Sequence, residues 1–301
     1  MTPDIDAARL VFSPAAMDAL NGVLAIVIFA IALDLRPAQF GALARAPRPL
    51  LTGLIAQFAL LPALTCAMVW VLAPPASIAL GLIVVAACPG GNISNFITHR
   101  AGGNVALSVA LTAIATAGAV LLTPINIAFW GGLYPPAKAL MTQISLDPVS
   151  IALTIALMLG TPLVLGMAVN RWAPLISAKI RGPLQGLSML IFIAFVSIAF
   201  IANFDLFITY GPQIVGLVAI HNLLGLGAGY AAARAAKLGQ ADTRSITFET
   251  GIQNSGLGLI LIFGFFEGLG GMALVAAFWG IWHAVTGLAL ARLWSRSAIV
   301  P

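Results

Sequence analysis

One carboxylate stands inside an apolar stretch of this chain. Glu249 lies in FETGIQNSGLG, about one turn into the apolar run 245–266. An isolated carboxylate is costly to bury in apolar surroundings, so it must either reach water at an interface or be neutralised. Hydroxyl and amide side chains follow it closely, namely Thr250, Gln253, Asn254 and Ser255. This dense polar group favours a bound cation over an interfacial Glu.

A second segment of similar character is CPGGNISN, Cys88 to Asn95. Proline lacks a backbone donor and glycine disfavours helix, so this segment predicts a helix break with freed backbone groups. Ser94 and Asn95 follow the break, and Ser108 and Thr112 lie four residues apart, on one helix face. Helix–helix packing by small polar residues is the alternative interpretation of Ser108 and Thr112. Carboxylate, amide, hydroxyl and carbonyl oxygens together suit a hard cation such as sodium.

The composition places these residues in a membrane. Of 301 residues, 61% are hydrophobic and 8% are charged, whereas soluble domains carry about 25% charged residues. The net charge of +5 is spread in twos and threes between apolar runs, which argues against nucleic-acid binding. Cys66 and Cys88 lie in apolar runs and are interpreted as core residues, with no transition-metal site. The N-terminus lacks the basic start of a cleaved signal, so the first run is expected to remain as a span.

We predict an all-α polytopic protein of the inner (plasma) membrane, a single transmembrane domain over 1–301. About nine spans fall at 17–34, 49–72, 77–98, 104–130, 148–170, 184–204, 211–233, 245–266 and 271–293. Successive connecting segments must lie on alternating sides of the membrane. This puts Arg9 and Lys138 on one side and the other 12 Lys and Arg residues on the opposite side. The positive-inside rule then puts the N-terminus outside and the C-terminus in the cytoplasm. Residues 131–147 are interpreted as a short extracellular loop.

The interrupted spans occupy corresponding places. Four predicted spans precede the span at 148–170 and four follow it. The third span of each group of four is interrupted. The two groups enter the membrane in opposite senses, so they form inverted repeats, and paired interrupted spans indicate the binding site of a secondary transporter. Each break also follows a span with a polar site at mid-membrane, Gln57 in the first group and His221–Asn222 in the second. His283, among aromatic residues, is either a packing residue or part of a substrate pocket.

Two long motifs carry a family resemblance. CPGGNISNFITHRAGGNVALSVALT (88–112) and FETGIQNSGLG (248–258) resemble the bile acid:sodium symporter family, and IAQF, IHN and WH match in order. The resemblance implies two broken helices that cross in a core domain, about 49–130 and 211–293, beside a panel of 17–34, 148–170 and 184–204. It also implies two sodium sites. The first uses Ser94, Asn95, Ser108, Thr112 and Glu249, and the second uses Gln57, Glu249 and Gln253 with the main-chain carbonyls of Thr250 and Ile252.

The resemblance also implies a substrate cavity bordered by Asn92, Asn254 and His283. Two departures stand out: bacterial relatives commonly have ten spans, and many members have Thr where this chain has Asn92. We therefore expect a sodium-coupled symporter that moves a small organic anion by alternating access, such as a pantoate-like or pyruvate-like acid or a bile-acid-like compound. No obligatory protein partner is expected. Glu249 as a proton carrier is the alternative. An intramembrane enzyme is more remote, because no nucleophile–base pattern stands out, and a passive channel or a receptor fits the unlike half-sites poorly.

Overall fold

The computed structural model of the chain describes residues 5, 6, 22, 25, 26, 28–30, 32, 33, 47–143, 148–202 and 204–295, and its regular elements are helices. Most of the predicted first span, 17–34, lies outside these residues. The helices are α3 (Pro47–Ile55), the π-helical η1 (Ala56–Leu60), α4 (Leu61–Leu72), α5 (Ala76–Ala87), α6 (Ile93–Arg100), α7 (Val105–Leu133), α8 (Pro135–Gln143), α9 (Pro148–Trp172), α10 (Pro174–Ala202), α11 (Phe204–Ala235), α12 (Gln240–Gly251), α13 (Ser255–Phe265) and α14 (Gly270–Ser295).

Several helices have the length and composition of membrane spans. Among the described residues, four are long and apolar enough to cross a bilayer: Pro47–Leu72, Val105–Leu133, Phe207–Ala235 and Gly270–Ser295. The shorter helices α5 and α13 are also apolar, and 11 of the 12 residues of α5 and most residues of α13 are buried. A helix that is apolar on every side belongs in the interior of a bundle. The regular structure of the described residues is therefore helical, and the chain is a multi-pass membrane protein.

Both predicted breaks are present. Helix α5 ends at Ala87, and Cys88 is extended (φ −73°, ψ 156°) because the residue before a proline is kept out of the α region. Helix α6 resumes at Ile93. Helix α12 ends at Gly251, Ile252 is extended (φ −122°, ψ 100°), and α13 starts at Ser255. Each break thus divides one span into two half-helices.

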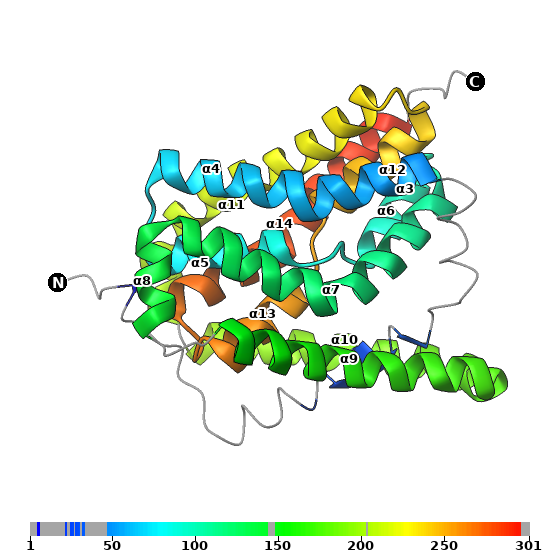
Figure 1. Ribbon diagram of the computed structural model, residues 1–301, viewed down its shortest axis with the longest axis horizontal. Coiled ribbons are helices and arrows are strands. Elements are labelled where there is room, and N and C mark those ends of the chain that lie inside the picture. The colour runs from blue at the N-terminus through cyan, green and yellow to red at the C-terminus, as the bar shows by residue number, and fades with distance from the viewer. Residues whose placement is uncertain are drawn as a thin grey trace.

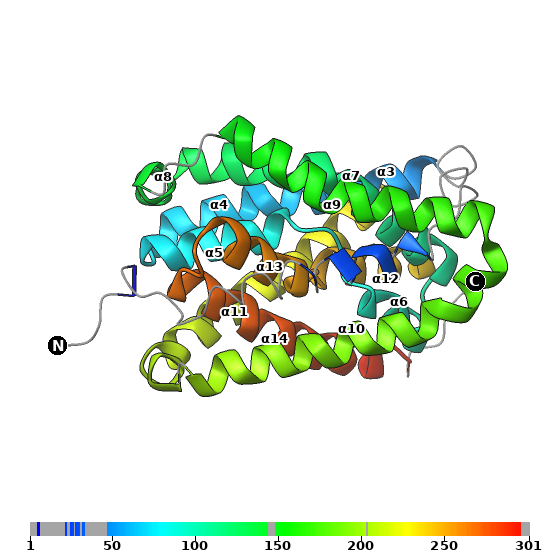
Figure 2. The ribbon, with the colours of Figure 1, turned by 90° about the horizontal axis from the view of Figure 1, so that it is seen from below.

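The half-helices lie among the other helices, and α9 and α10 lie to one side. Helix α12 contacts α11, α6 and α7, while α5 contacts α14, α7 and α13. Helices α9 and α10 run along one side of the bundle, where α9 contacts α7 and α10 contacts α11 (Figures 1 and 2). This arrangement surrounds the two breaks with protein.

Three sequence predictions need correction. Residues 135–143 form helix α8 within the segment interpreted as a loop, because two prolines at the helix start and the following AKALM favour helix. Helix α10 begins at Pro174, ten residues before the predicted span at 184–204. Helix α12 begins at Gln240, so Glu249 lies in its last turn rather than one turn into a span. The first residues of this helix include the polar Gln240, Asp242 and Thr243, so hydropathy predicts a later start.

Candidate cation site at the crossing of two broken helices

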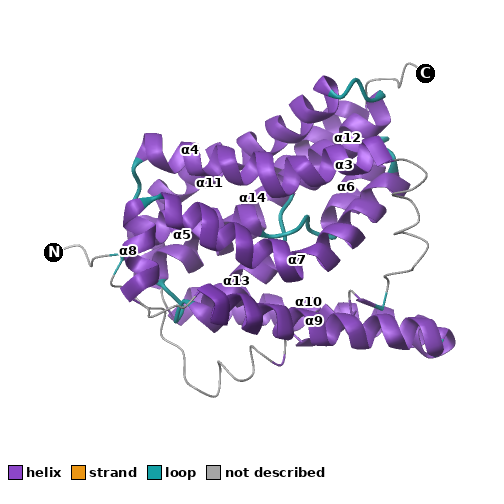
Figure 3. Ribbon diagram, in the orientation of Figure 1, coloured by secondary structure: helices purple, strands orange, loops and turns teal. Residues whose placement is uncertain are grey.

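The two breaks lie against each other as a short antiparallel pair. The Gly91 amide donates to the Ile252 carbonyl (2.8 Å), and the Asn254 amide donates to the Pro89 carbonyl (2.9 Å). Gly90 and Gln253 form the bridge between the two chains, and the loops that contain them meet in the middle of the bundle (Figure 3). These hydrogen bonds satisfy backbone groups that the breaks free at membrane depth.

The glycine pair permits this close approach. A Cβ on Gly90 would collide with Oε1 of Glu249, and a Cβ on Gly91 would lie 3.0 Å from the Gln253 carbonyl oxygen. Real Cβ atoms are rarely found so close to other heavy atoms. A side chain at Gly90 would therefore displace the Glu249 carboxylate, and one at Gly91 would force the Gln253 backbone to shift by a few tenths of an ångström. Neither glycine has a positive φ, so the constraint is steric.

Glu249 is buried at this crossing, with 1% of its surface exposed. Its carboxylate accepts hydrogen bonds from Ser94 Oγ (2.6 Å to Oε2), Thr112 Oγ1 (2.8 Å to Oε1 and 3.0 Å to Oε2) and Ser108 Oγ (3.5 Å to Oε2). The Thr112 hydroxyl also lies 3.3 Å from Asn95 Oδ1. The structure thus brings together all five residues that the family resemblance implies for the first sodium site. The interpretation of Glu249 as an interfacial residue is wrong.

This donor set suits a hard cation. In the described part of the chain, the side-chain partners of Glu249 are neutral hydroxyls, and no group of three or more His, Cys, Asp or Glu gathers to hold a metal. Helices α5 and α12 both end at the crossing, and the C-terminal end of a helix carries partial negative charge. A carboxylate in the last turn of α12 is therefore unfavourable by itself. A bound monovalent cation would offset both the charge of the carboxylate and the partial negative charge of the two helix ends.

A second polar group lies beside the first. The Gln57 side-chain amide donates to Gln253 Oε1 (2.7 Å) and to the Cys88 carbonyl (2.7 Å). The Gln253 amide donates to Gln57 Oε1 (3.2 Å) and to the Thr250 carbonyl (2.7 Å). Gln57 lies in the π-helical stretch η1, a local widening that often occurs at functional sites. No residue pattern in IAQFAL predicts this π-helix.

The other residues of the predicted second site lie in the same segment. The Ile252 carbonyl accepts from the Gly91 amide across the crossing. Glu249 adjoins this group, because a Cβ added to Gly90 would lie within 3.0 Å of both its carboxylate and its main-chain oxygen.

The three predicted substrate-lining residues are more dispersed. Asn92 is exposed and precedes α6, and Asn254 uses its side-chain oxygen to cap α13 by accepting from the Leu257 amide (3.0 Å). His283 is buried on α14, with its ring centroid 6.5 Å from that of Trp279. Asn92 and Asn254 thus flank the crossing at the starts of α6 and α13, and no hydrogen bond links His283 to either of them.

Comparison with known proteins assigns the chain to a family. The model of the Sodium Bile acid symporter family matches residues 22–210. The chain belongs to this family. The chain is 33% identical over 273 residues to the "Uncharacterized sodium-dependent transporter YocS" of Bacillus subtilis, which covers 91% of this chain and 82% of that protein. It is 31% identical to the rice "Probable sodium/metabolite cotransporter BASS1, chloroplastic" over 82% of this chain, and 29% identical to the human "P3 protein" over 73%.

Membership of the sodium bile acid symporter family settles the general class of function. The matched region spans 59% of the rice protein and 45% of the human protein, so these two relatives are considerably longer. The bacterial and plant relatives are named as transporters or cotransporters. The chain is a sodium-coupled membrane transporter and not an enzyme.

Proposed function

We propose that the protein is a symporter that couples the entry of two sodium ions to the uptake of one small organic anion. The observation that carries this proposal is the buried Glu249 carboxylate, which is surrounded by hydroxyls and lies where two broken helices meet. A carboxylate of this kind needs a positive counter-charge, and Ser94, Ser108 and Thr112 offer oxygens instead of a basic side chain.

The first ion would bind Glu249, Ser94, Asn95, Ser108 and Thr112. The second would bind Gln57, Gln253, Glu249 and the carbonyls of Thr250 and Ile252. Glu249 would then be shared, and each ion would bring together parts of both breaks. Sodium binding would thereby fix the relative position of the two breaks before substrate binds.

The substrate carboxylate would bind near the starts of α6 and α13. The N-terminal ends of helices carry partial positive charge and free amides, so they attract anions without needing an arginine. Asn92 and Asn254 border this region, and His283 would line it from α14. A small monocarboxylate, such as a pantoate-like or pyruvate-like acid, fits this scheme better than a bulky steroid acid.

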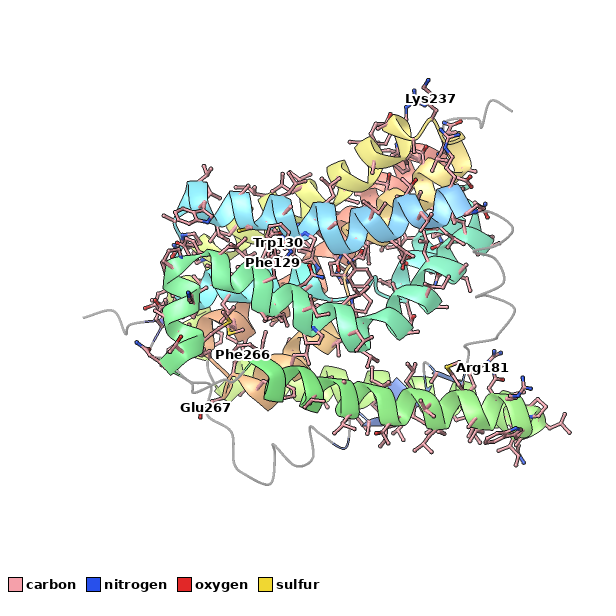
Figure 4. All side chains as sticks on the ribbon, in the orientation of Figure 1. Phe129, Trp130, Arg181, Lys237, Phe266 and Glu267 are labelled. Carbon is pink, nitrogen blue, oxygen red and sulfur yellow. The ribbon has the colours of Figure 1, made fainter. Side chains whose placement is uncertain are left out.

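The proposed architecture has nine spans in inverted repeats, with a core that moves against a panel built from 17–34, α9 and α10. The C-terminus would be cytoplasmic. The positive-inside rule supports this orientation, because Arg181 and Lys237 lie at the same end of the bundle, where α6 and α12 meet (Figures 1 and 4). Alternating access would then expose the crossing first to the outside and then to the cytoplasm.

Thermal stability of the purified protein tests the proposal. A ligand that binds only the folded state raises its stability by mass action. Small carboxylates and bile acids would be screened in sodium and in potassium, with Glu249→Ala as the control. We expect one carboxylate to stabilise the wild-type protein only with sodium. Stabilisation that does not depend on sodium but changes with pH would instead favour proton coupling through Glu249.

A further inference from the structure

A buried amide on α11 holds the second break from outside the proposed sodium sites. The Asn222 side chain donates from Nδ2 to the Gly251 carbonyl (2.8 Å), and its Oδ1 accepts from the Thr286 hydroxyl of α14 (2.6 Å). Asn222 is fully buried, and none of the proposed sodium or substrate contacts uses Asn222 or Thr286.

The orientation of this amide is fixed from both sides. The Gly251 carbonyl can only accept, so the amide nitrogen must face it. Oδ1 then faces Thr286, whose single hydroxyl hydrogen has three acceptors in reach: Asn222 Oδ1 at 2.6 Å, the Trp282 carbonyl at 3.1 Å and the His283 carbonyl at 3.2 Å. The shortest of these contacts goes to Asn222. Thr286 is therefore the partner that keeps Asn222 directed at Gly251.

Asn222 has a counterpart in the other half of the chain. Gln57, on the span before the first break, donates to the Cys88 carbonyl, and Asn222, on the span before the second break, donates to the Gly251 carbonyl. In both halves an amide from the preceding span satisfies a carbonyl that the end of a half-helix leaves without an intrahelical partner. Gln57 also contacts Gln253, whereas Asn222 contacts α14 instead.

We propose that Asn222 and Thr286 are a positioning pair for the second sodium site, an inference that rests on the proposed function. Gly251 lies between Thr250 and Ile252, whose carbonyls are the proposed main-chain ligands. Because Asn222 holds the Gly251 carbonyl, it fixes the peptide plane between these two ligands and keeps both directed at the ion. Partners that orient ligands in this way contribute strongly to the affinity of metal sites. Thr286 is three residues from His283, so the pair also ties the sodium site to the helix with a substrate-lining candidate.

Sodium titration of the purified protein tests the pair, with thermal stabilisation as the signal and potassium used to keep ionic strength constant. Thr286→Val removes the hydroxyl at nearly constant shape, and Thr286→Ser retains it. The matched control is Thr65→Val, because Thr65 is a buried threonine whose hydroxyl bonds to Leu61 and His221 instead. Asn222→Ala serves as a second disrupting variant.

We expect Thr286→Val and Asn222→Ala to raise the half-saturating sodium concentration about fivefold, the effect of one net hydrogen bond. Thr286→Ser and Thr65→Val should stay near the wild-type value. An unchanged sodium titration in Thr286→Val, even with lower stability in potassium, would reduce the pair to a structural contact and overturn the inference. If the wild-type protein itself shows no response to sodium, the proposed function fails together with the inference.

Discussion

Thr112→Val removes the hydroxyl that contacts both oxygens of Glu249 while leaving the shape of the side chain nearly unchanged. The Thr112 hydroxyl lies 2.8 Å from Oε1 and 3.0 Å from Oε2, whereas the Ser94 and Ser108 hydroxyls contact Oε2. A hydrogen bond to a charged group contributes about 1.5–3 kcal/mol, and about 1.4 kcal/mol corresponds to a tenfold change in affinity. The substitution also deletes one of the five proposed ligands of the first ion. We expect the half-saturating sodium concentration to rise at least about tenfold.

The assay is binding of radioactive sodium to purified protein at constant ionic strength. Thr116→Val is the matched control, because Thr116 lies one turn further along α7, is buried, and makes no hydrogen bond to Glu249. Thr112→Ser should retain most of the affinity. Equal sodium affinity in Thr112→Val and Thr116→Val would refute the assignment of Thr112 to a sodium site, whatever the stability of the two variants.

Three further substitutions separate the sodium sites from the rest of the structure. Gly90→Ala places a methyl group against Glu249, so we expect a loss of about 1–3 kcal/mol of stability together with weaker sodium binding; wild-type values in both titration and unfolding would contradict the packing argument. Gln57→Ala should raise the sodium concentration needed for uptake, and an unchanged sodium requirement with altered pH dependence would support proton coupling instead. Asp6→Asn replaces a carboxylate that accepts hydrogen bonds from the Ala76 and Ser77 amides at the start of α5. It should lower the stability of the protein by up to about 1 kcal/mol and leave the sodium titration unchanged. A shifted titration in this last variant would show that the start of α5 is linked to ion binding.

The sequence predicted the parts of the site that follow from local chemistry. Pro89 and its two glycines forced a break where the structure has one, and Glu249 could not be buried without compensation. The grouping of Glu249 with Ser94, Ser108 and Thr112 came from the family resemblance, because residues 155 and 141 positions apart have no local signal of contact.

Features that depend on contacts between helices were missed. Asn222 was recognised as a polar residue at mid-membrane, but its bonds to Gly251 and Thr286 join three helices and cannot be deduced from spacing. Asn254 was assigned to the substrate region, and the structure adds a capping role for its side chain at the start of α13. Hydropathy alone does not predict helix α8, which is too short and too polar for a span, although the residues PPAKALM favour a helix.

Sodium-driven accumulation in proteoliposomes tests the central claim most directly. Vesicles containing the protein would be supplied with radiolabelled pantoate, pyruvate or taurocholate, each tested separately under an inward sodium gradient. We predict that at least one of these anions accumulates above its external concentration and that Glu249→Gln abolishes this accumulation. If an anion instead accumulates equally well under a proton gradient without sodium, or only equilibrates across the membrane, the sodium-coupled mechanism is contradicted.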